Sequence, residues 1–242
     1  MKLYVVGMGA GSKDGITYEA RKVLENADVI VGYTVYADLV KAFLPYKEYF
    51  TSGMKQERER CQKAVELAAH GKNVAVVCSG DSGVYGMASL VHELAAEYED
   101  IEVCAVAGVT AALSGGALVG APLGHDFAVI SLSDLLTPFE KIEKRLEAAA
   151  EADFVICLYN PSRKKSDDYL KKACEIILKH RDTKTICAAA KNIDRAGEEY
   201  SIMTLGELTD YSADTFTTVF IGNSQTKVIK GKMVTPRGYK NV

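Results

Sequence analysis

A glycine-rich turn at residues 79–83, Ser-Gly-Asp-Ser-Gly, is the stretch best suited to hold a small ligand. It follows the apolar run Val74–Cys78, whose β-branched residues predict a buried strand, and a helical pattern starts near Val84. A strand, a glycine-rich turn and a helix together present backbone N–H and C=O groups at the carboxyl edge of an α/β sheet. The turn lacks the Gly-Lys-Ser/Thr of a Walker loop. Taken alone, the pattern fits equally well a tight turn that needs glycine only for its backbone conformation.

A second glycine-rich turn follows the first predicted strand and raises the alternative of a dinucleotide site. The dinucleotide fingerprint is G-x-G-x-x-G, but here glycines stand at 7, 9 and 11, and Ser12 takes the place of the third. The acidic residue expected after the second strand is also missing, because that strand ends in Gly32-Tyr33. With both requirements unmet, we do not expect NAD(P) binding.

Composition and charge exclude several classes of protein. The 242 residues are 48% apolar and 25% charged, which allows one large or two modest domains with real cores. The net charge of −3 predicts no bulk attraction to nucleic acid or anionic lipid. No apolar run approaches the roughly 20 residues of a membrane span, and no secretory signal precedes the first strand. We therefore expect a cytoplasmic protein.

The cysteine pattern does not predict a metal centre. None of the six cysteines forms a C-x-x-C pair or has a close histidine partner, so neither a zinc nor an iron–sulfur site is expected. Four of them stand in predicted strands, where small reduced core residues are the expected role: Cys78, Cys104, Cys157 and Cys187.

Strands and helices alternate over the first half of the chain. This alternation predicts a mostly parallel sheet with helices on both faces. The predicted strands are Lys2–Val6, Ala27–Val31, Glu48–Phe50, Val74–Cys78 and Ile101–Val106. The predicted helices are Tyr18–Asn26 with Thr17 as N-cap, Tyr36–Phe43, Lys55–His70 ending at Gly71, and Val84–Tyr98.

A second α/β domain is predicted after a boundary at Gly120–Gly124, where proline and glycine cluster behind a helix at Ala111–Val119. The domains would be 1–119 and 120–242. Strands spaced closely after residue 183 predict a mixed, partly antiparallel second sheet. Its predicted strands are Phe127–Leu132, Phe154–Tyr159, Thr185–Ala190, Tyr200–Met203 and Phe216–Ile221, with Val228-Ile229 as a candidate edge strand; the predicted helices are Phe139–Glu151 and Asp167–His180.

Several stretches resemble the signatures of the tetrapyrrole methylases, the class III S-adenosylmethionine-dependent methyltransferases, in the same order along almost the whole chain. They are Val6–Gly11, Ile16-Thr17, Ala27–Gly32, Gly80–Gly86 and Ala107–Ala111. Ser82 and Ala107 stand where the family often has proline, a change expected to affect loop stiffness more than chemistry.

Other stretches resemble the members of the family that methylate C17 of precorrin-3B or cobalt-factor III during corrin biosynthesis. They are Gly120–Phe127, Ser131–Pro138, Tyr159–Pro161, Ile221–Ser224 and Met233–Tyr239. The resemblance implies ring contraction as an associated activity, and a homodimer. Two alternatives stay open: a corrin or sirohaem methyltransferase with another target carbon, and a non-catalytic tetrapyrrole-binding protein.

The resemblance implies an S-adenosylmethionine site in a cleft between two α/β domains. The residues carried over to that site are Ala10, Ser79, Gly80, Asp81, Val84, Tyr85, Thr110, Ala111, Tyr159, Asn192 and Thr218. Asp81 could instead stabilise its own turn, and Tyr159 and Thr218 could be residues at the edge of the core.

The implied substrate carries many acetate and propionate arms, so cationic side chains should line its site. The candidates are Lys13, Lys191 and Arg237, with Gly9 and Gly11 letting the backbone approach the macrocycle. The run Arg163–Lys165 is a further candidate, although a charge run is usually a solvated surface. Positioning should supply most of the rate of methyl transfer.

Ring contraction requires proton transfer, for which His125 and Asp126 are the candidate acid–base residues. The alternative is that both merely bond loop backbone. Ser131, Ser133 and Asp134 are weaker candidates, since Ser133-Asp134 could instead cap the next helix.

Overall fold

The computed structural model describes residues 1–162 and 169–239 and divides the chain into two compact units. The first is Met1–Ala111 and the second is Ala112–Val242. The division lies at the start of helix α5 (Ala111–Val119), whereas the sequence predicted a boundary after this helix. The reason is packing, because the helix lies on the sheet of the second unit.

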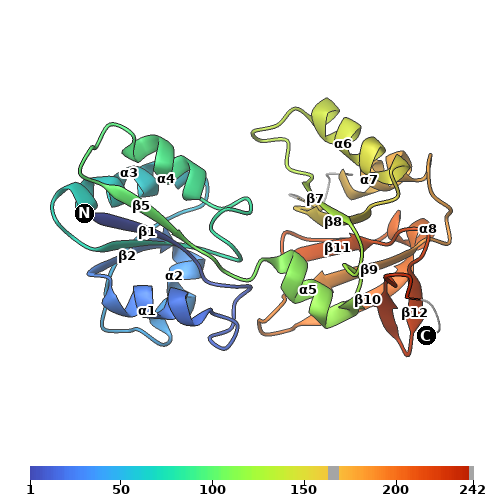
Figure 1. Ribbon diagram of the computed structural model, residues 1–242, viewed down its shortest axis with the longest axis horizontal. Coiled ribbons are helices and arrows are strands. Elements are labelled where there is room, and N and C mark those ends of the chain that lie inside the picture. Colours follow the sequence, from blue (N-terminus) through green and yellow to red (C-terminus); the bar gives the residue numbers. More distant parts are fainter. Residues whose placement is uncertain (163–168, 240–242) are drawn as a thin grey trace. The chain divides into compact units, whose positions relative to one another are not determined.

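The first unit contains a five-stranded sheet in the order β3-β2-β4-β1-β5 (Figure 1). Every neighbouring pair in it is parallel, which confirms the predicted parallel sheet. Its central strands are buried on both faces and are rich in valine, as a parallel sheet covered by helices requires. The strands are β1 (Lys2–Gly7), β2 (Val29–Tyr33), β3 (Glu48–Ser52), β4 (Val74–Cys78) and β5 (Glu102–Val106).

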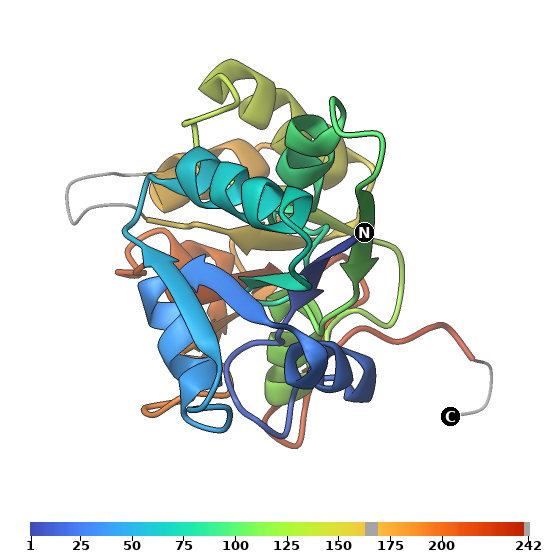
Figure 2. The same cartoon turned by 90° about the vertical axis from the view of Figure 1, so that its left-hand side faces the viewer.

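Two pairs of helices cover the two faces of this sheet (Figures 1 and 2). The helices α3 (Glu57–Ala69) and α4 (Ala88–Ala95) pack on the face that carries Val5 and Val76. The helices α1 (Tyr18–Asn26) and α2 (Thr34–Lys41) pack on the opposite face, which carries Val6 and Val77 among others. Successive residues of a strand point to opposite faces, so alternate valines serve the two cores.

Local signals explain where some helices begin. The predicted N-cap Thr17 accepts a hydrogen bond from the Ala20 N–H at 3.1 Å, and α1 has its predicted bounds. The prediction for α4 was wrong, because the helix starts at Ala88 and not near Val84. Tyr85 has a φ of +54°, a left-handed conformation that an α-helix excludes.

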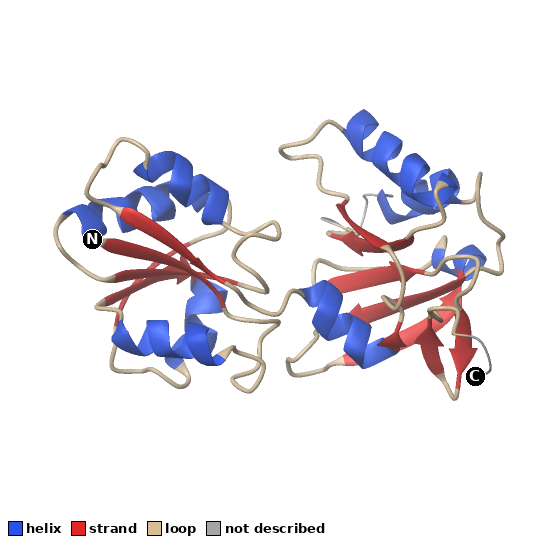
Figure 3. Ribbon diagram, viewed as in Figure 1, coloured by secondary structure: helices blue, strands red, loops and turns tan. Residues whose placement is uncertain are grey.

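The second unit contains a mixed five-stranded sheet, as predicted, in the order β10-β9-β11-β8-β7 (Figure 3). Only β7 and β8 are parallel; the other three pairs are antiparallel. Its strands are β7 (Phe127–Ser131), β8 (Val155–Tyr159), β9 (Ile186–Lys191), β10 (Glu199–Thr204) and β11 (Thr217–Ile221); its other helices are α6 (Phe139–Glu151), α7 (Tyr169–Ile177) and the short α8 (Leu205–Leu208).

The faces of this second sheet are covered differently (Figure 1). Helices α6 and α7 pack on one face through apolar side chains such as Leu146 and Ile177. On the other face α5 approaches through Gly115, where a Cβ atom would lie 2.8 Å from Ile193 Cδ1. The glycine therefore allows a helix-to-sheet distance that alanine would not.

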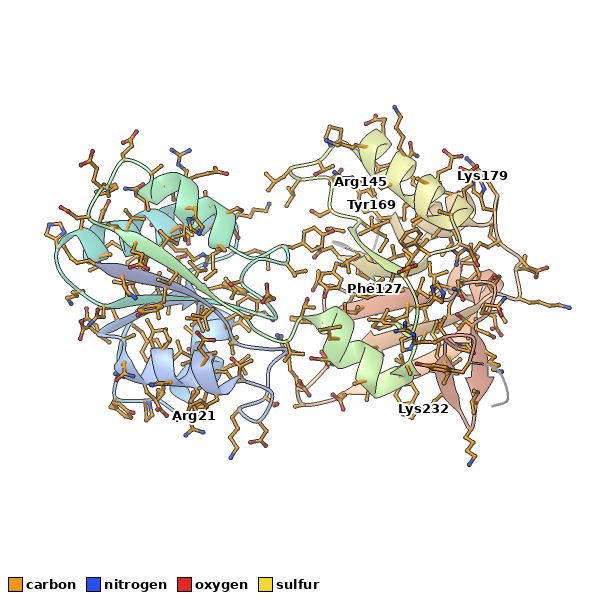
Figure 4. The ribbon with its side chains drawn as sticks, in the orientation of Figure 1. Arg21, Phe127, Arg145, Tyr169, Lys179 and Lys232 are labelled. Carbon is orange, nitrogen blue, oxygen red and sulfur yellow. The ribbon has the colours of Figure 1, made fainter. Side chains whose placement is uncertain are left out.

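The sequence did not predict a small third sheet in the second unit. Strand β13 (Lys232–Val234) pairs antiparallel with β12 (Lys227–Ile229) and parallel with β6 (Gly120–Ala121). The predicted edge strand at Val228-Ile229 is part of β12, which lies at the edge of this sheet. Lys232 ties the sheet to α5, since its Nζ donates to the Leu118 carbonyl at 2.8 Å (Figure 4).

Five cysteines are buried, and burial raises the pKa of the Cys78 thiol to about 11. Cys104 was predicted to be buried but is only half-buried, because β5 is an edge strand. Among the described residues, no helix combines the length and apolar character that crossing a bilayer requires. In the same part of the chain, no three His, Cys, Asp or Glu side chains gather as metal ligands would.

Candidate functional site

The loops that follow β1 and β4 are joined at the carboxyl edge of the parallel sheet. The Gly9 N–H donates to the Gly80 carbonyl at 3.0 Å, and the Gly80 N–H donates to the Gly9 carbonyl at 2.7 Å. The chain leaves β1 towards α1 and leaves β4 towards α4, on opposite faces of the sheet. Neighbouring strands whose connections diverge in this way form a switch point, where α/β proteins bind ligands.

Asp81 fastens the loop after β4 to the loop after β5. Its Oδ1 accepts from the N–H groups of Gly83 and Val84 at 2.8 and 3.1 Å, and its Oδ2 accepts from the Gly108 N–H at 2.9 Å. These contacts give Asp81 the turn-stabilising role that the sequence left open. Ser82 adds a tether, since its buried hydroxyl donates to the Val106 carbonyl at 3.2 Å, which proline could not do. The ligand role of Asp81 stays a prediction.

Glycines at this edge are required by close backbone packing. A Cβ atom on Gly108 would lie 2.1 Å from the Gly80 carbonyl oxygen, and one on Gly7 would lie 2.7 Å from the same oxygen. Gly9 and Gly80 have φ angles of +76° and +67°, which other residues rarely adopt. The peptide groups of Gly9 are already used in the bridge to Gly80. The approach of a macrocycle to the backbone at Gly9 and Gly11 stays a prediction.

The structure gathers most of the cofactor residues predicted in the first unit at this edge. Ser79 and Gly80 directly follow β4, and a Cβ atom on Gly80 would lie 3.5 Å from Thr110 Cα. The Tyr85 side chain is 57% exposed, so its ring is accessible to a ligand. Ala10 is buried, whereas the predicted substrate cation Lys13 is exposed.

The three cofactor residues predicted in the second unit share one edge of the mixed sheet. Thr218 on β11 pairs with Ala190 near the end of β9, and Asn192 is the first residue after β9. Tyr159 is the last residue of β8. Because β11 is antiparallel to both neighbours, its beginning meets their carboxyl ends. The Tyr159 hydroxyl accepts from the Ala112 N–H at 2.6 Å and so caps the first turn of α5.

The predicted substrate residue Lys191 is engaged in ion pairs. Its Nζ lies 3.2 Å from an Asp214 carboxylate oxygen and 3.8 Å from one of Glu199. The hydrogen bond and charge of Asp214 raise the pKa of Lys191. Burial opposes ionisation of Asp214, but hydrogen bonds from Thr217, the Phe216 N–H and Lys191 together lower its pKa. Much of the Lys191 charge is thus compensated within the fold.

The candidate acid–base pair lies on an exposed loop. The Asp126 N–H donates to His125 Nδ1 at 2.8 Å, so a neutral His125 carries its proton on Nε2. The Asp126 carbonyl accepts from the Val155 N–H at 3.1 Å, so this loop does bond backbone, as the alternative supposed. The His125 and Asp126 side chains are 51% and 79% exposed and stay accessible to a substrate.

The weaker acid–base candidates form a polar group at the ends of β7 and β8. Ser131 Oγ accepts from Asn160 Nδ2 at 2.9 Å and from the Ser133 N–H at 3.3 Å. Asp134 accepts from the Tyr169 hydroxyl at 2.6 Å. Arg237 is exposed near the last described residues, and Arg163–Lys165 lie outside the described residues.

Comparison with known proteins decides the family. Residues 2–209 match the profile of the tetrapyrrole (corrin/porphyrin) methylases, which is well over half of the chain. The chain belongs to the tetrapyrrole methylases. It is 46% identical to a probable cobalt-factor III C(17)-methyltransferase of Salmonella typhimurium, over 98% of this chain and 99% of that protein. It is 38% identical to a precorrin-3B C(17)-methyltransferase of a Sinorhizobium species, over 98% of this chain and 96% of the relative.

A solved structure of a tetrapyrrole methylase has the same fold. The crystal structure of the methyltransferase CobJ superimposes with a TM-score of 0.89 at 35% identity, covering 96% of this chain and 98% of that one. The family signatures that the sequence displayed therefore lie in the glycine loops of a true tetrapyrrole methylase fold. Tetrapyrrole methylases use S-adenosylmethionine.

One residue that lines a pocket at this edge, Arg60, was not among the site residues predicted from the sequence. It lines a pocket of about 230 Å³ beside the Ser79 loop, together with Tyr33 and Tyr85. The signal was present, because an arginine at position 60 interrupts the apolar face that Cys61, Ala64 and their neighbours give to α3. A charged residue on the buried face of a helix requires a partner or a ligand.

Proposed function

We propose that this tetrapyrrole methylase transfers a methyl group to C17 of cobalt-factor III or precorrin-3B, with ring contraction, in cobalamin biosynthesis. One observation carries the proposal. The chain matches a relative of that name at 46% identity over nearly the full length of both proteins. The polar ends of β7 and β8 carry part of the resemblance to this branch, and the glycine loops carry the resemblance to the family as a whole.

S-adenosylmethionine fits the chemistry at the edge of the first sheet. When bound, it supplies the methyl group from its sulfonium and leaves as S-adenosylhomocysteine. Peptide groups around Ser79 and Gly80, the exposed ring of Tyr85 and the Thr110 hydroxyl would hold its polar and flat parts. The Gly9–Gly80 bridge and the Asp81 carboxylate keep these groups rigid before binding, so little ordering remains to be done when the ligand arrives.

Positioning is the main task of the chain in methyl transfer, since the target carbon must meet the methyl group in line. We assign the binding roles that the resemblance implies to Tyr159, Asn192 and Thr218 of the second unit, and to Gly9, Gly11, Lys13, Lys191 and Arg237. His125 would exchange a proton with the substrate during ring contraction, with the Asp126 carboxylate 3.5 Å from its Nδ1. A homodimer is proposed by resemblance alone, and sedimentation velocity would test it.

The decisive experiment is incubation with methyl-labelled S-adenosylmethionine and either cobalt-factor III or precorrin-3B. We expect label on the macrocycle, and carbon NMR of the product to place it at C17. Label at another carbon would favour a methylase of different regiospecificity. Tight binding of the macrocycle without turnover would favour the alternative of a non-catalytic tetrapyrrole-binding protein.

The role of His125 requires a separate test, since its loop contacts could be purely structural. We expect His125→Asn to retain methyl transfer and lose ring contraction, as judged from the mass and absorption spectrum of the product. The matched control is His70→Asn, an exposed histidine at the end of α3. Equal loss of both steps in His125→Asn would contradict the acid–base role.

A further inference from the structure

The pocket that contains Arg60 lies at the carboxyl ends of β2 and β4, within the first unit. Its walls are mainly aromatic and thioether side chains, namely Tyr33, Tyr36, Tyr85, Met54 and Met87. Tyr33 and Tyr36 pack edge to face with ring centroids 5.2 Å apart. Such walls suit a flat conjugated ring or methylene groups. None of these five residues was among the predicted binding residues except Tyr85.

Arg60 places a positive charge at the base of this pocket. Its side chain is 2% exposed, and among the described residues it is the only charged one that is buried as a whole residue. The guanidinium donates to the Ser52 and Gly53 carbonyls at 3.3 and 3.2 Å and to Glu57 at 3.3 Å. All three bonds are long for charge-assisted hydrogen bonds.

The charge of Arg60 is incompletely compensated within the protein. Among the described residues its ionic partner is Glu57, which also lines the pocket and is 50% exposed, so water weakens the attraction. The Tyr33 ring adds only a distant cation–π contact, with its centroid 5.8 Å from the guanidinium carbon. No described residue accepts a hydrogen bond from Arg60 Nε, although that atom is buried. Burying a guanidinium in this way costs stability, and an anionic ligand would offset the cost. If this helix position served packing alone, an apolar side chain could be buried there with a smaller loss of free energy.

The structure assigns this pocket to a carboxylate-bearing arm of the tetrapyrrole substrate, with Arg60 as the counter-charge. The assignment rests on the proposed function and names a part of the substrate site that the sequence reasoning did not include. The guanidinium fork matches a planar carboxylate, and the tyrosine and methionine side chains match the methylenes and the pyrrole ring that carry it. Ser79 also lines the pocket, so an arm held there would be anchored beside the predicted cofactor loop.

The first test is titration of the full-length protein with cobalt-factor III, followed by absorption, in parallel with calorimetric titration with S-adenosylmethionine. We expect Arg60→Met to weaken macrocycle binding at least about tenfold and to leave cofactor binding within about twofold. The control is Arg58→Met, an exposed arginine of the same helix, which should bind both ligands like the wild type.

A second pair of variants covers the case in which Arg60→Met does not fold. Met54 is 67% exposed at the pocket mouth, so both charges should be tolerated there. Met54→Glu should weaken macrocycle binding several-fold by repelling the carboxylate, and Met54→Lys should not weaken it. Tyr46→Glu, at a 72% exposed site outside the pocket lining, is the control for added charge.

The outcomes separate this inference from the function on which it rests. If the wild type binds macrocycle and the Met54 variants bind it equally, the pocket assignment is overturned and the proposed function stands. If a folded Arg60→Met protein binds the macrocycle as tightly as the wild type, the pocket assignment is likewise overturned and the proposed function stands. If the wild type does not bind the macrocycle at all, both are overturned.

Discussion

The two units stabilise the sheet edges that carry the predicted binding residues by different means. In the first, three loops are joined through peptide groups, glycine contacts and the single carboxylate of Asp81. In the second, individual side chains do this work, such as the Tyr159 hydroxyl on α5 and Lys191 on Asp214. Parallel strands bring their connecting loops to one edge, where backbones can bond each other. An antiparallel edge mixes strand starts with strand ends, and here side-chain contacts add to main-chain bonds such as that from the Asn192 N–H to the Phe216 carbonyl.

The far end of the second sheet follows the same rule. Arg181 has a buried side chain that donates to main-chain carbonyls of the last turn of α6, the α6–β8 connection and the turn after β11. These are the carbonyls of Ala149, Ala150, Phe154 and Gly222. Burial lowers the pKa of this guanidinium, and nearby Asp153 opposes that effect. One side chain thus joins the end of α6 to the turn after β11, two segments that are far apart in the sequence.

The largest effect is expected from Gly108→Ala, which tests backbone packing in the first unit. The new methyl would lie 2.1 Å from the Gly80 carbonyl oxygen, so the loops must separate. We expect a loss of about 3 kcal/mol or more in the free energy of unfolding, measured in urea. Gly71→Ala is the control: its φ is +89° but nothing lies within 4 Å, so only backbone strain of roughly 1 kcal/mol should appear. Equal losses in the two variants would mean that packing is not the cause.

Arg181→Met should cost somewhat less, about 2–3 kcal/mol, because four hydrogen bonds to main-chain carbonyls are lost while the apolar stem is kept. Arg145→Met on the exposed side of α6 provides the comparison and should be nearly neutral (Figure 4). Urea unfolding of both proteins measures the difference. A neutral Arg181→Met would mean that the second unit does not depend on side-chain clamps.

Asp81→Asn should have an intermediate effect of about 1–2 kcal/mol, because an amide offers one acceptor oxygen in place of the two that the loops use. It also separates the two roles considered for this residue. A turn-stabilising role predicts that stability falls while the affinity for S-adenosylmethionine, measured by calorimetry on the folded fraction, changes little. A large loss of affinity with unchanged stability would restore the ligand role.

The smallest effect is expected from Lys191→Met and should depend on pH. The folded-state pKa of Asp214 lies below its ordinary value, so its ionised form contributes stability above about pH 4, and this is lost as the pH falls further. The Lys191→Met variant loses the hydrogen bond and the positive charge through which Lys191 lowers the pKa of Asp214. The difference in unfolding free energy from the wild type should therefore be present at pH 7 and shrink below about pH 4. Lys144→Met, on α6, should show no such pH dependence.

Local signals allowed much of the fold to be predicted. The N-cap Thr17, the proline before Phe139 and the glycine after His70 mark helix ends within the chain itself. Strand β4 has its predicted bounds because its apolar run is continuous and stops at glycine-rich residues. Elements of this kind depend on a few neighbouring residues.

The errors lie where distant residues decide the conformation. Tyr85 is left-handed and Gly86 packs against Ser82, so α4 begins later than its periodicity indicates. Strand β6 has two residues and pairs with a strand near the other end of the unit, which no local pattern announces. In the site, the position of Asp81 was predicted but its bonds were not. Arg60 was missed, because the apolar spacing of α3 was used only to locate its buried face, and the charged residue on that face was not considered.

The pairing of β6 with β13 has a consequence for synthesis on the ribosome. The parallel sheet of the first unit is complete once β5 has left the exit tunnel, so this unit can fold early. The second unit must wait, because its five-stranded sheet is incomplete until β11 has been translated and Ala121 meets Val234 later still. Its nascent chain therefore exposes apolar surface for almost the whole time of its own elongation. Chaperone contacts during translation should accordingly concentrate on the second unit.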